Sequence, residues 1–451
     1  MKHFKVSLSA IVLVILSIVL VSKIFHTKRY QQPETVIAWD VISYYAYLPA
    51  TFIEHDLTLS FTDHEHAGTY WPETLPDGTK VIKTSMGLSL LYLPFFAIAH
   101  LTAPLAGYEA NGFTLPYALA LLLAGLFYTL LGLALLRKLL LEHFGEIATT
   151  LTLLIIGLCT NLYWYSVYEA PMSHSFGFGL FCLFAYLTVK WHKKPGYLIS
   201  IGLGLTLGLI SLVRPTNCIV VLFFLLYGIK SLKGIKEKWQ LFLGSYKKIL
   251  IIAASTILVW VPQMIYWYSL TGHLFFYSYG SDERFFFNHP MILQGLFGFR
   301  KGWLIYTPAM VFALIGFIPL YKHFREYFWG ILLFLALHIY IIFSWWCWWY
   351  GGGFGLRAMI ETYALLSIPL TATLQWILKM PVVRKTVLLV CVAAVSFLSC
   401  FHNIQYFNGA IHWDSMTKES YFDSFLRMHP TSRFDSLLQT PDYEAARKGD
   451  R

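Results

Sequence analysis

One carboxylate of this chain stands where it could do chemistry. Asp40 lies in the run Trp39-Asp40-Val41-Ile42-Ser43-Tyr44-Tyr45, shortly after the first apolar segment of membrane length. An ionisable side chain at membrane level is costly unless it faces water or a partner, so such a residue is a candidate functional group. The same position also suits an acid that simply sits in interfacial water. Tyr44 follows at a fixed spacing and joins Asp40 as a candidate.

A second pair of ionisable residues occupies a short turn between two apolar segments. The turn reads Glu169-Ala170-Pro171-Met172-Ser173-His174. Glu169 and His174 could orient a substrate, assist a base or help to bind a divalent cation. Alternatively, the pair only caps the helix that follows.

Five basic residues near the ends of apolar segments could hold an anion such as phosphate. Arginine can grip phosphate oxygens with its planar fork, whereas lysine acts as a point charge. The alternative for each is an interfacial cation that contacts lipid headgroups. Arg357 follows Gly351-Gly352-Gly353-Phe354-Gly355, where the backbone can approach a ligand closely, but the run has neither Walker nor Rossmann spacing. The candidates are Lys83, Arg214, Arg300, Lys301 and Arg357.

The loop after the first apolar segment also holds two acidic pairs, Glu54-His55-Asp56 and Asp63-His64-Glu65. With His66 they could bind a divalent metal, and Glu54, Asp56, Asp63 and Glu65 are its candidate ligands. No spacing among them is diagnostic of a metal site. A divalent cation is therefore a possible cofactor, and the sequence requires none.

The elements that position these residues follow from the composition. Hydrophobic residues make up 57% of the 451 positions and charged residues 13%, in apolar segments long enough to cross a hydrocarbon core of about 30 Å. Closed barrels show short alternating strands instead, so a bundle of helices is expected. The fold class is an all-α polytopic membrane protein. The net charge of +10 then concerns membrane orientation, and no nucleic-acid partner is expected.

About eleven transmembrane helices are expected. The first, Phe4 to Ile24, lacks an Ala-x-Ala-like cleavage site and exceeds a typical signal core, so we interpret it as an uncleaved anchor. The six cysteines, at positions 159, 182, 218, 347, 391 and 400, lie mostly in apolar segments and predict packing residues rather than disulfides or metal ligands. The further spans are 113–136, 147–167, 174–191, 196–213, 216–230, 249–267, 303–320, 327–344, 358–378 and 386–403.

Basic residues follow alternate spans, which predicts a cytoplasmic N-terminus and an external C-terminal tail. Lys23, Lys28 and Arg29 conflict with this orientation, but five later loops outweigh them. The alternation requires that Gly87 to Leu105, anchored by Tyr92 and interrupted by Pro94 and Pro104, lies in the interface or re-enters. Residues 1–403 then form one membrane module, with 25–112 as an outer loop that holds juxtamembrane helices, and 404–451 form a short external tail.

The order of these features resembles the GT-C superfamily of integral-membrane glycosyltransferases, and bacterial members in particular. The likeness covers most of the chain: one anchor, an outer loop that begins with Asp-x-x-x-Tyr at Asp40, Lys83 before a juxtamembrane stretch, and about ten further spans. After Lys83 the chain reads Thr84-Ser85-Met86-Gly87, where some relatives have a Pro-Pro pair, which leaves the role of Lys83 in question. The matching motifs are Glu169-Ala-Pro-Met-Ser-His174, Leu212-Val-Arg-Pro-Thr-Asn217, Gly298-Phe-Arg-Lys-Gly-Trp-Leu-Ile-Tyr-Thr-Pro308 and Trp349-Tyr-Gly-Gly-Gly-Phe-Gly-Leu-Arg357.

The resemblance implies transfer of a sugar from a polyprenyl-phosphate carrier to a glycan, lipid or protein acceptor, at the outer face of a bacterial cytoplasmic membrane. Asp40 would be the catalytic base, and the basic residues would bind the phosphate. The acidic pairs of the first loop resemble loosened Asp-x-Asp motifs of some members and compete with Asp40. A ligase or polymerase of lipid-linked glycans is the nearest alternative. A transporter or flippase fits less well, because its ionisable residues should lie in the middle of its helices.

Overall fold

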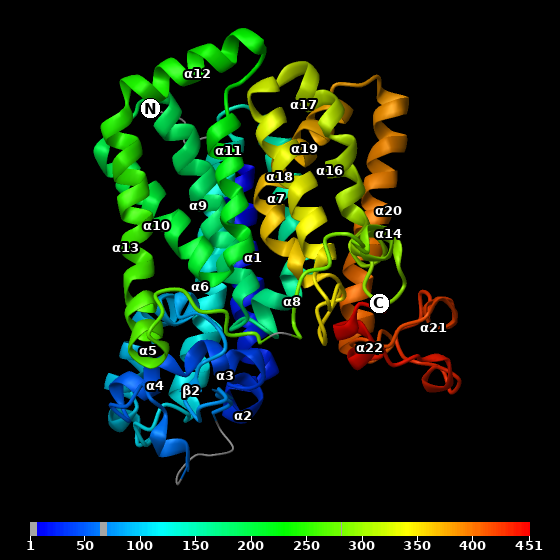
Figure 1. Ribbon diagram of the computed structural model, residues 1–451. Coiled ribbons are helices and arrows are strands. Elements are labelled where there is room, and N and C mark those ends of the chain that lie inside the picture. Colours follow the sequence, from blue (N-terminus) through cyan, green and yellow to red (C-terminus); the bar gives the residue numbers. More distant parts are fainter. Residues whose placement is uncertain (1–6, 64–69, 281) are drawn as a thin grey trace.

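The computed structural model describes residues 7–63, 70–280 and 282–451 of a predominantly helical protein (Figure 1). The start of the expected first span, at Phe4, lies outside the described residues. The single sheet within these ranges is a two-stranded antiparallel ribbon, β1 (Glu73–Thr74) with β2 (Lys80–Val81). The expected all-helical class is therefore confirmed.

Five helices in the described part of the chain are long and apolar enough to cross a membrane. At 1.5 Å of rise per residue, about 20 residues span the hydrocarbon core. The protein is therefore a membrane protein. The five are α1 (Leu8–Thr27), α6 (Leu115–Leu140), α13 (Tyr246–Thr271), α18 (Arg325–Ser344) and α20 (Val382–Phe407).

Two further expected spans are continuous helices, and the remaining four are broken into pieces. The continuous ones are α9 (Ser173–Lys193) and α10 (Tyr197–Val213). The broken ones are α7 (Glu146–Leu158) with α8 (Leu162–Val167), η4 (Pro215–Val220) with α11 (Val221–Leu226), η6 (Arg357–Thr362) with α19 (Tyr363–Leu378), and the series α15 (Trp303–Tyr306), η5 (Pro308–Met310), α16 (Val311–Ile315) and α17 (Phe317–His323).

The breaks have local causes. Pro215 and Pro308 each begin a short 3₁₀ turn, because proline has no N–H to continue an α-helix. Between α7 and α8, the Thr160 hydroxyl accepts a hydrogen bond from the N–H of Leu162, the first residue of α8, at 3.2 Å. At each break, residues within an expected span leave the regular helical geometry that a continuous helix would impose.

The first loop and the chain after α20 lie at the same end of the bundle, opposite the basic helix α12 (Leu232–Gly244) (Figure 1). Sequence reasoning took α12 for a lysine-rich loop and missed it. The last helices are α21 (Lys418–Asp423) and α22 (Tyr443–Lys448), and α14 (Ile292–Phe297) precedes α15. The first loop contains α2 (Pro33–Val36), α3 (Asp40–Tyr45), α4 (Tyr47–Phe52) and α5 (Gly87–Thr102).

Helix α5 runs without a break through Pro94, so the expected interruption at that residue is wrong. The helix packs against α3, α4, α6 and α10. Its first residue, Gly87, lies so close to the α10 backbone that a Cβ would come within 2.5 Å of the Leu212 carbonyl carbon. Close packing of this kind holds the first loop against the bundle.

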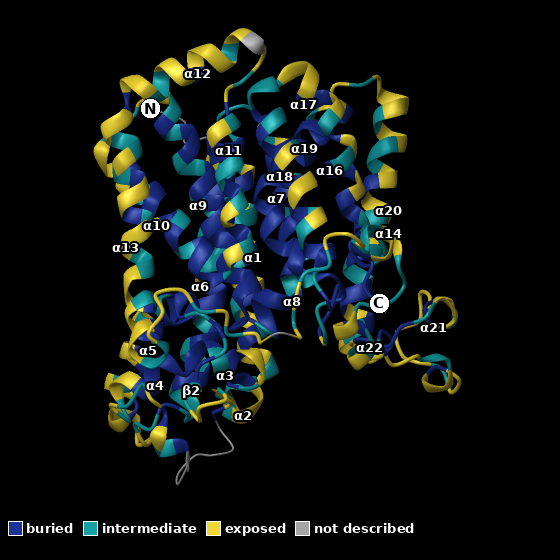
Figure 2. Ribbon diagram, in the orientation of Figure 1, coloured by how far each residue is buried: buried dark blue, intermediate teal, exposed yellow. Residues whose placement is uncertain are grey.

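Buried residues fill the centre of the bundle, whereas α13 and α20 expose long outer faces (Figure 2). Small residues allow the central helices to approach closely, as is common between membrane helices. At Gly125 of α6, a Cβ would lie 1.9 Å from the Ala170 carbonyl oxygen, between α8 and α9. This contact fixes the turn that carries Glu169.

Candidate active site at the loop end of the bundle

Asp40 begins helix α3 and pairs with Arg357, which lies 317 positions away in the chain. Asp40 Oδ2 lies 3.2 Å from Arg357 Nη2, and the two side chains are 49% and 15% exposed. The residue before Asp40, Trp39, has φ 51° and ψ −134°, a conformation that costs a non-glycine residue about 1–3 kcal/mol.

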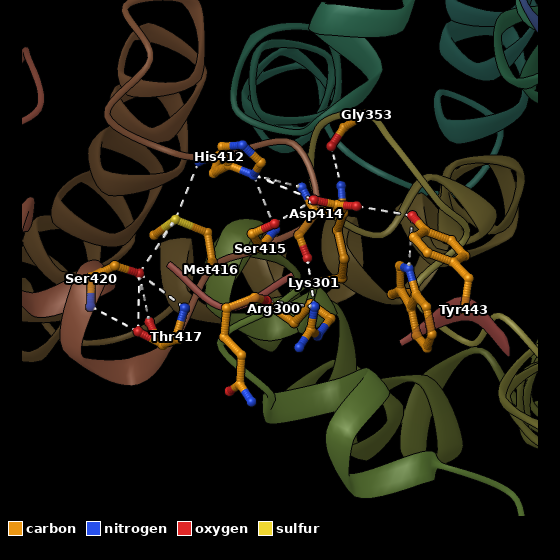
Figure 3. Close-up of polar contacts among 12 residues, drawn as sticks. Arg300, Lys301, Gly353, His412, Asp414, Ser415, Met416, Thr417, Ser420 and Tyr443 are labelled. Atoms are coloured by element: carbon orange, nitrogen blue, oxygen red, sulfur yellow. Dashed lines mark hydrogen bonds and ion pairs between the residues drawn. The ribbon is translucent and has the colours of Figure 1, made fainter. Parts of the chain in front are cut away.

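A glycine-rich loop positions Arg357. Gly351 and Gly353 have φ values of 62° and 131°, where a Cβ is disfavoured. A Cβ on Gly353 would also lie 2.4 Å from the Tyr165 hydroxyl. The Gly353 carbonyl accepts a hydrogen bond from the Lys301 ammonium group (Figure 3). Only glycine fits this position, and the loop turns tightly before Arg357.

Asp40 and Arg357 line a cavity of about 630 Å³. This volume lies in the range of small-molecule sites. The cavity also exposes Glu169 and Arg29, so two carboxylates and two guanidinium groups share its walls. The remaining lining residues are Thr35, Val36, Ala38, Trp39, Val41, Tyr168, Pro171, Met172, Gly351, Gly352, Gly353, Tyr406 and Trp413.

Glu169 is half-buried, and its carboxylate makes no hydrogen bond or ion pair with any residue that the structure describes. Arg29, by contrast, is fixed: it donates to the backbone carbonyls of Tyr168 and Thr35. Burial lowers the pKa of Arg29, and the charge of Glu169 partly offsets this effect. The cavity thus offers one paired acid, Asp40, and one acid whose oxygens are available to a ligand.

His174 lies behind the cavity in a buried cluster with Glu361 and Arg214. His174 Nδ1 is 3.1 Å from Glu361 Oε1, and Arg214 Nη1 is 3.9 Å from the same oxygen. Two buried polar atoms, His174 Nε2 and Glu361 Oε2, have no hydrogen-bond partner among the described residues. The buried Tyr44 lies near this cluster: burial raises its pKa, and the charge of Asp40 raises it further.

Lys83 is held in an ion-pair network between the first loop and the loop before α14. Its ammonium group lies 3.2 Å from Glu73 and 3.1 Å from Glu283, and 5.4 Å from the ring centre of Tyr279. Burial acts to lower the pKa of Lys83, but the two carboxylates outweigh it and raise the pKa. Lys83 is not among the residues that line the cavity.

Arg300 and Lys301 contact the chain that follows α20 and the glycine loop (Figure 3). Arg300 donates to the carbonyls of Asp414 at 2.9 Å and Gln439 at 3.1 Å. Lys301 is 2% exposed, and burial, followed by the charge of Arg357, lowers its pKa to about 7. Neither residue lines the cavity, so the structure gives both a supporting position.

The acidic pairs of the first loop are placed only in part. Asp56 accepts hydrogen bonds from Thr58 and Ser60, and these outweigh burial and lower its pKa to about 2. The described residues contain no group of three or more side chains suited to hold a metal, Glu54 and Asp56 included. His64, Glu65 and His66, and the side chain of Asp63, lie outside the described residues.

No family model and no curated protein matches this chain. The role of the cavity therefore has to be inferred from its own residues.

Sequence reasoning missed two residues of this region. Glu361 was counted as part of an apolar span, although a carboxylate in such a span is a recognised signal of a functional or paired group. Arg29 was treated as an exception to the topology, whereas it forms a wall of the cavity. For Glu361, a carboxylate in apolar surroundings is the available signal, whereas Arg29 lies in the polar stretch 26–32 and has no comparable local signal.

The six cysteines carry free thiols. Cys400 Sγ lies 2.9 Å from Cys159 Sγ, where α20 passes the break between α7 and α8.

Proposed function

We propose that the protein is a membrane glycosyltransferase that moves a sugar from a polyprenyl-phosphate carrier to an acceptor hydroxyl at the non-cytoplasmic face. The observation that carries this proposal is the pairing of Asp40 with Arg357 on the wall of a cavity that also holds Glu169 and Arg29. A proton-accepting carboxylate and fixed cations are the two kinds of group that such a transfer needs.

The reaction assigns a task to each group. The acceptor oxygen bonds to the anomeric carbon, and the bond from that carbon to the phosphate oxygen breaks. Asp40 takes the acceptor proton, as a positioned general base does. Arg357 stabilises the departing lipid phosphate, because a fixed guanidinium is placed before the negative charge develops. The buried Nε of Arg357 has no hydrogen-bond partner within the described residues.

Glu169 and Arg29 complete the site in this proposal. The oxygens of Glu169 can accept hydrogen bonds from sugar or acceptor hydroxyls, and Arg29 adds a second positive charge to the wall. His174 and Arg214 act from behind the cavity, where Glu361 neutralises Arg214 at 3.9 Å. Lys83, Arg300 and Lys301 support the loops that form the site.

The topology that goes with this function has about eleven spans, some of them broken helices. Support comes from the ends of the bundle: the first loop and the residues after α20 lie at one end, and the basic helix α12 lies at the other (Figure 1). A reporter fused after Lys194 is expected in the cytoplasm, and one fused at Arg451 is expected to be exported. Both reporters on the same side would contradict the arrangement.

The test is turnover by the full chain in detergent with a panel of polyprenyl-phosphate sugars and envelope extracts as acceptors. Asp40→Asn is expected to lower the release of polyprenyl phosphate about 10²- to 10⁴-fold, the range for loss of a general base. Asp77→Asn is a matched control, because Asp77 is exposed and lies outside the cavity lining. Parallel assays with EDTA and with Mg²⁺ measure metal dependence.

Other results would redirect the proposal. Unchanged turnover in Asp40→Asn with loss in Glu169→Gln would transfer the role of base to Glu169. Transfer of whole glycan chains instead of single sugars would identify a ligase. Substrate uptake into vesicles without sugar transfer would identify a transporter.

A further inference from the structure

Two tryptophans with exposed side chains line the cavity and come from distant parts of the chain. Trp39 is 75% exposed and comes from the first loop, whereas Trp413 is 50% exposed and follows α20. Both line the cavity that contains Asp40 and Glu169. An exposed indole beside a polar cavity offers a flat apolar face to a ligand.

The backbone holds Trp39 in a strained conformation to present its ring. Its φ of 51° is unusual for a bulky residue, and such outliers gather at ligand-binding sites. The ring packs edge-to-face on Trp71, with 5.6 Å between centroids. Because the Trp39 carbonyl accepts a hydrogen bond from the N–H of Ile42 at 3.0 Å, the strained residue is tied directly to the start of α3. The residue that carries the exposed ring is therefore anchored next to the candidate base Asp40.

Trp413 precedes a residue whose side chain is fixed. The carboxylate of Asp414, fully buried, accepts hydrogen bonds from Ser415 at 2.6 Å and from Tyr443 at 2.9 Å (Figure 3). On the other side, the indole of Trp413 approaches Gly352 so closely that a Cβ there would lie 3.1 Å from its ring. A side chain at position 352 would push the ring away, so the glycine leaves room for the indole.

We propose that Trp39 and Trp413 form a binding platform for a carbohydrate acceptor, so that the sugar is added to a glycan and not to a protein or to a simple lipid. This inference rests on the proposed function. The apolar C–H face of a sugar ring packs on an indole, while its hydroxyls need donors and acceptors at the edge. Arg29 and Glu169 supply both kinds of group in the same cavity. Lipid tails would leave these charges unpaired, which disfavours a purely apolar ligand.

The experiment is calorimetric titration of the full chain in detergent with four neutral oligosaccharides: cellotetraose, maltotetraose, mannotetraose and chitotetraose. Saturable binding of at least one is expected. Trp39→Ala and Trp413→Ala should each weaken that binding about three- to tenfold, the effect of one aromatic contact. Trp39→Phe should restore most of it. Trp239→Ala is the matched control, because Trp239 is exposed on α12 at the opposite end of the bundle and should not change binding.

The proposal is overturned if none of the four oligosaccharides binds, or if both alanine variants bind as the unmodified chain does. A second measurement asks whether the rings contact lipid instead: brominated lipids should quench the fluorescence of the unmodified chain and of Trp39→Phe/Trp413→Phe equally. Less quenching in the double variant would place the rings in the bilayer and also overturn the proposal.

Failure of this inference can be told from failure of the proposed function. Turnover that depends on Asp40, uses a peptide or lipid acceptor and is unaffected by both alanine variants would refute the platform alone. Absence of turnover with every donor would refute the function, and oligosaccharide binding would still decide whether the platform exists.

Discussion

Replacing Glu361 with glutamine removes a carboxylate that is 1% exposed and shared by two neighbours. His174 lies 3.1 Å from its Oε1 and Arg214 lies 3.9 Å from the same atom. Glutamine keeps the shape of the side chain and can still bond to His174, so the change isolates the loss of the charge that neutralises Arg214.

The size of the expected destabilisation follows from the distance between Arg214 and Glu361. Two unit charges 3.9 Å apart at an effective dielectric of about 20 attract by about 4 kcal/mol. The Arg214 side chain is 20% exposed, which reduces this value, so a loss of about 2–4 kcal/mol is expected, near the lower range for broken buried pairs. An unfolding entropy of about 2 cal/mol/K per residue over 451 residues makes this a fall of about 2–4 °C in the unfolding midpoint.

The assay is thermal unfolding of the full chain in one detergent, followed by a thiol-reactive dye. Glu326→Gln is the control: it removes an ion pair with Lys230 at 3.1 Å, but that lysine is 63% exposed. Exposed pairs contribute about 0–1 kcal/mol, so the control should shift the midpoint by less than about 1 °C. Equal shifts in the two variants, or an unchanged midpoint in Glu361→Gln, would refute the reasoning about the buried cluster.

Three further outcomes are expected. Gly125→Ala should destabilise the protein by about 1–3 kcal/mol, because the added Cβ would lie 1.9 Å from a backbone carbonyl oxygen. Gly244→Ala is the control and should not destabilise it, because the space around that Cβ is open. Thermal unfolding compares the two variants. Burial lowers the pKa of Lys301 to about 7, whereas the pKa in the unfolded chain is about 10.5. Between these two pH values the unfolded chain binds more protons than the folded chain, so the stability of the fold should rise with pH. Unfolding midpoints across this range should show the rise, and Lys301→Met should remove it. Arg300→Ala should speed limited proteolysis after α20, because it loses two carbonyl contacts there, and change donor turnover less than Arg357→Ala does.

Composition and apolar segments were enough to predict an all-helical membrane protein. They could not predict the broken helices, because hydropathy averaged over a span does not register one local contact such as that between the Thr160 hydroxyl and the N–H of Leu162. The helix α12 was missed for a related reason. Its lysines suggested a loop, whereas Ile235, Trp239 and Leu243 recur at helical spacing on one exposed face.

For the candidate site, too, part could be predicted from the sequence and part could not. Residue types and their order placed Asp40, Glu169 and Arg357 among the candidates, and the structure brings all three to one cavity. Sequence alone could not distinguish Arg357 from Arg300 and Lys301, which are also basic but contact backbone carbonyls. That distinction depends on long-range packing, which local spacing does not encode.

The walls of the cavity come from widely separated parts of the gene product: Asp40 early, Glu169 midway, and Trp413 late. During synthesis, the ribosome releases the first of them long before the last, and the nascent chain holds an incomplete pocket until α20 has been inserted. Under the proposed function, sugar transfer begins only after this insertion. A fragment that stops before α20 should be inert on its own, and co-expression with the missing piece should restore it only if both halves reach the same bilayer.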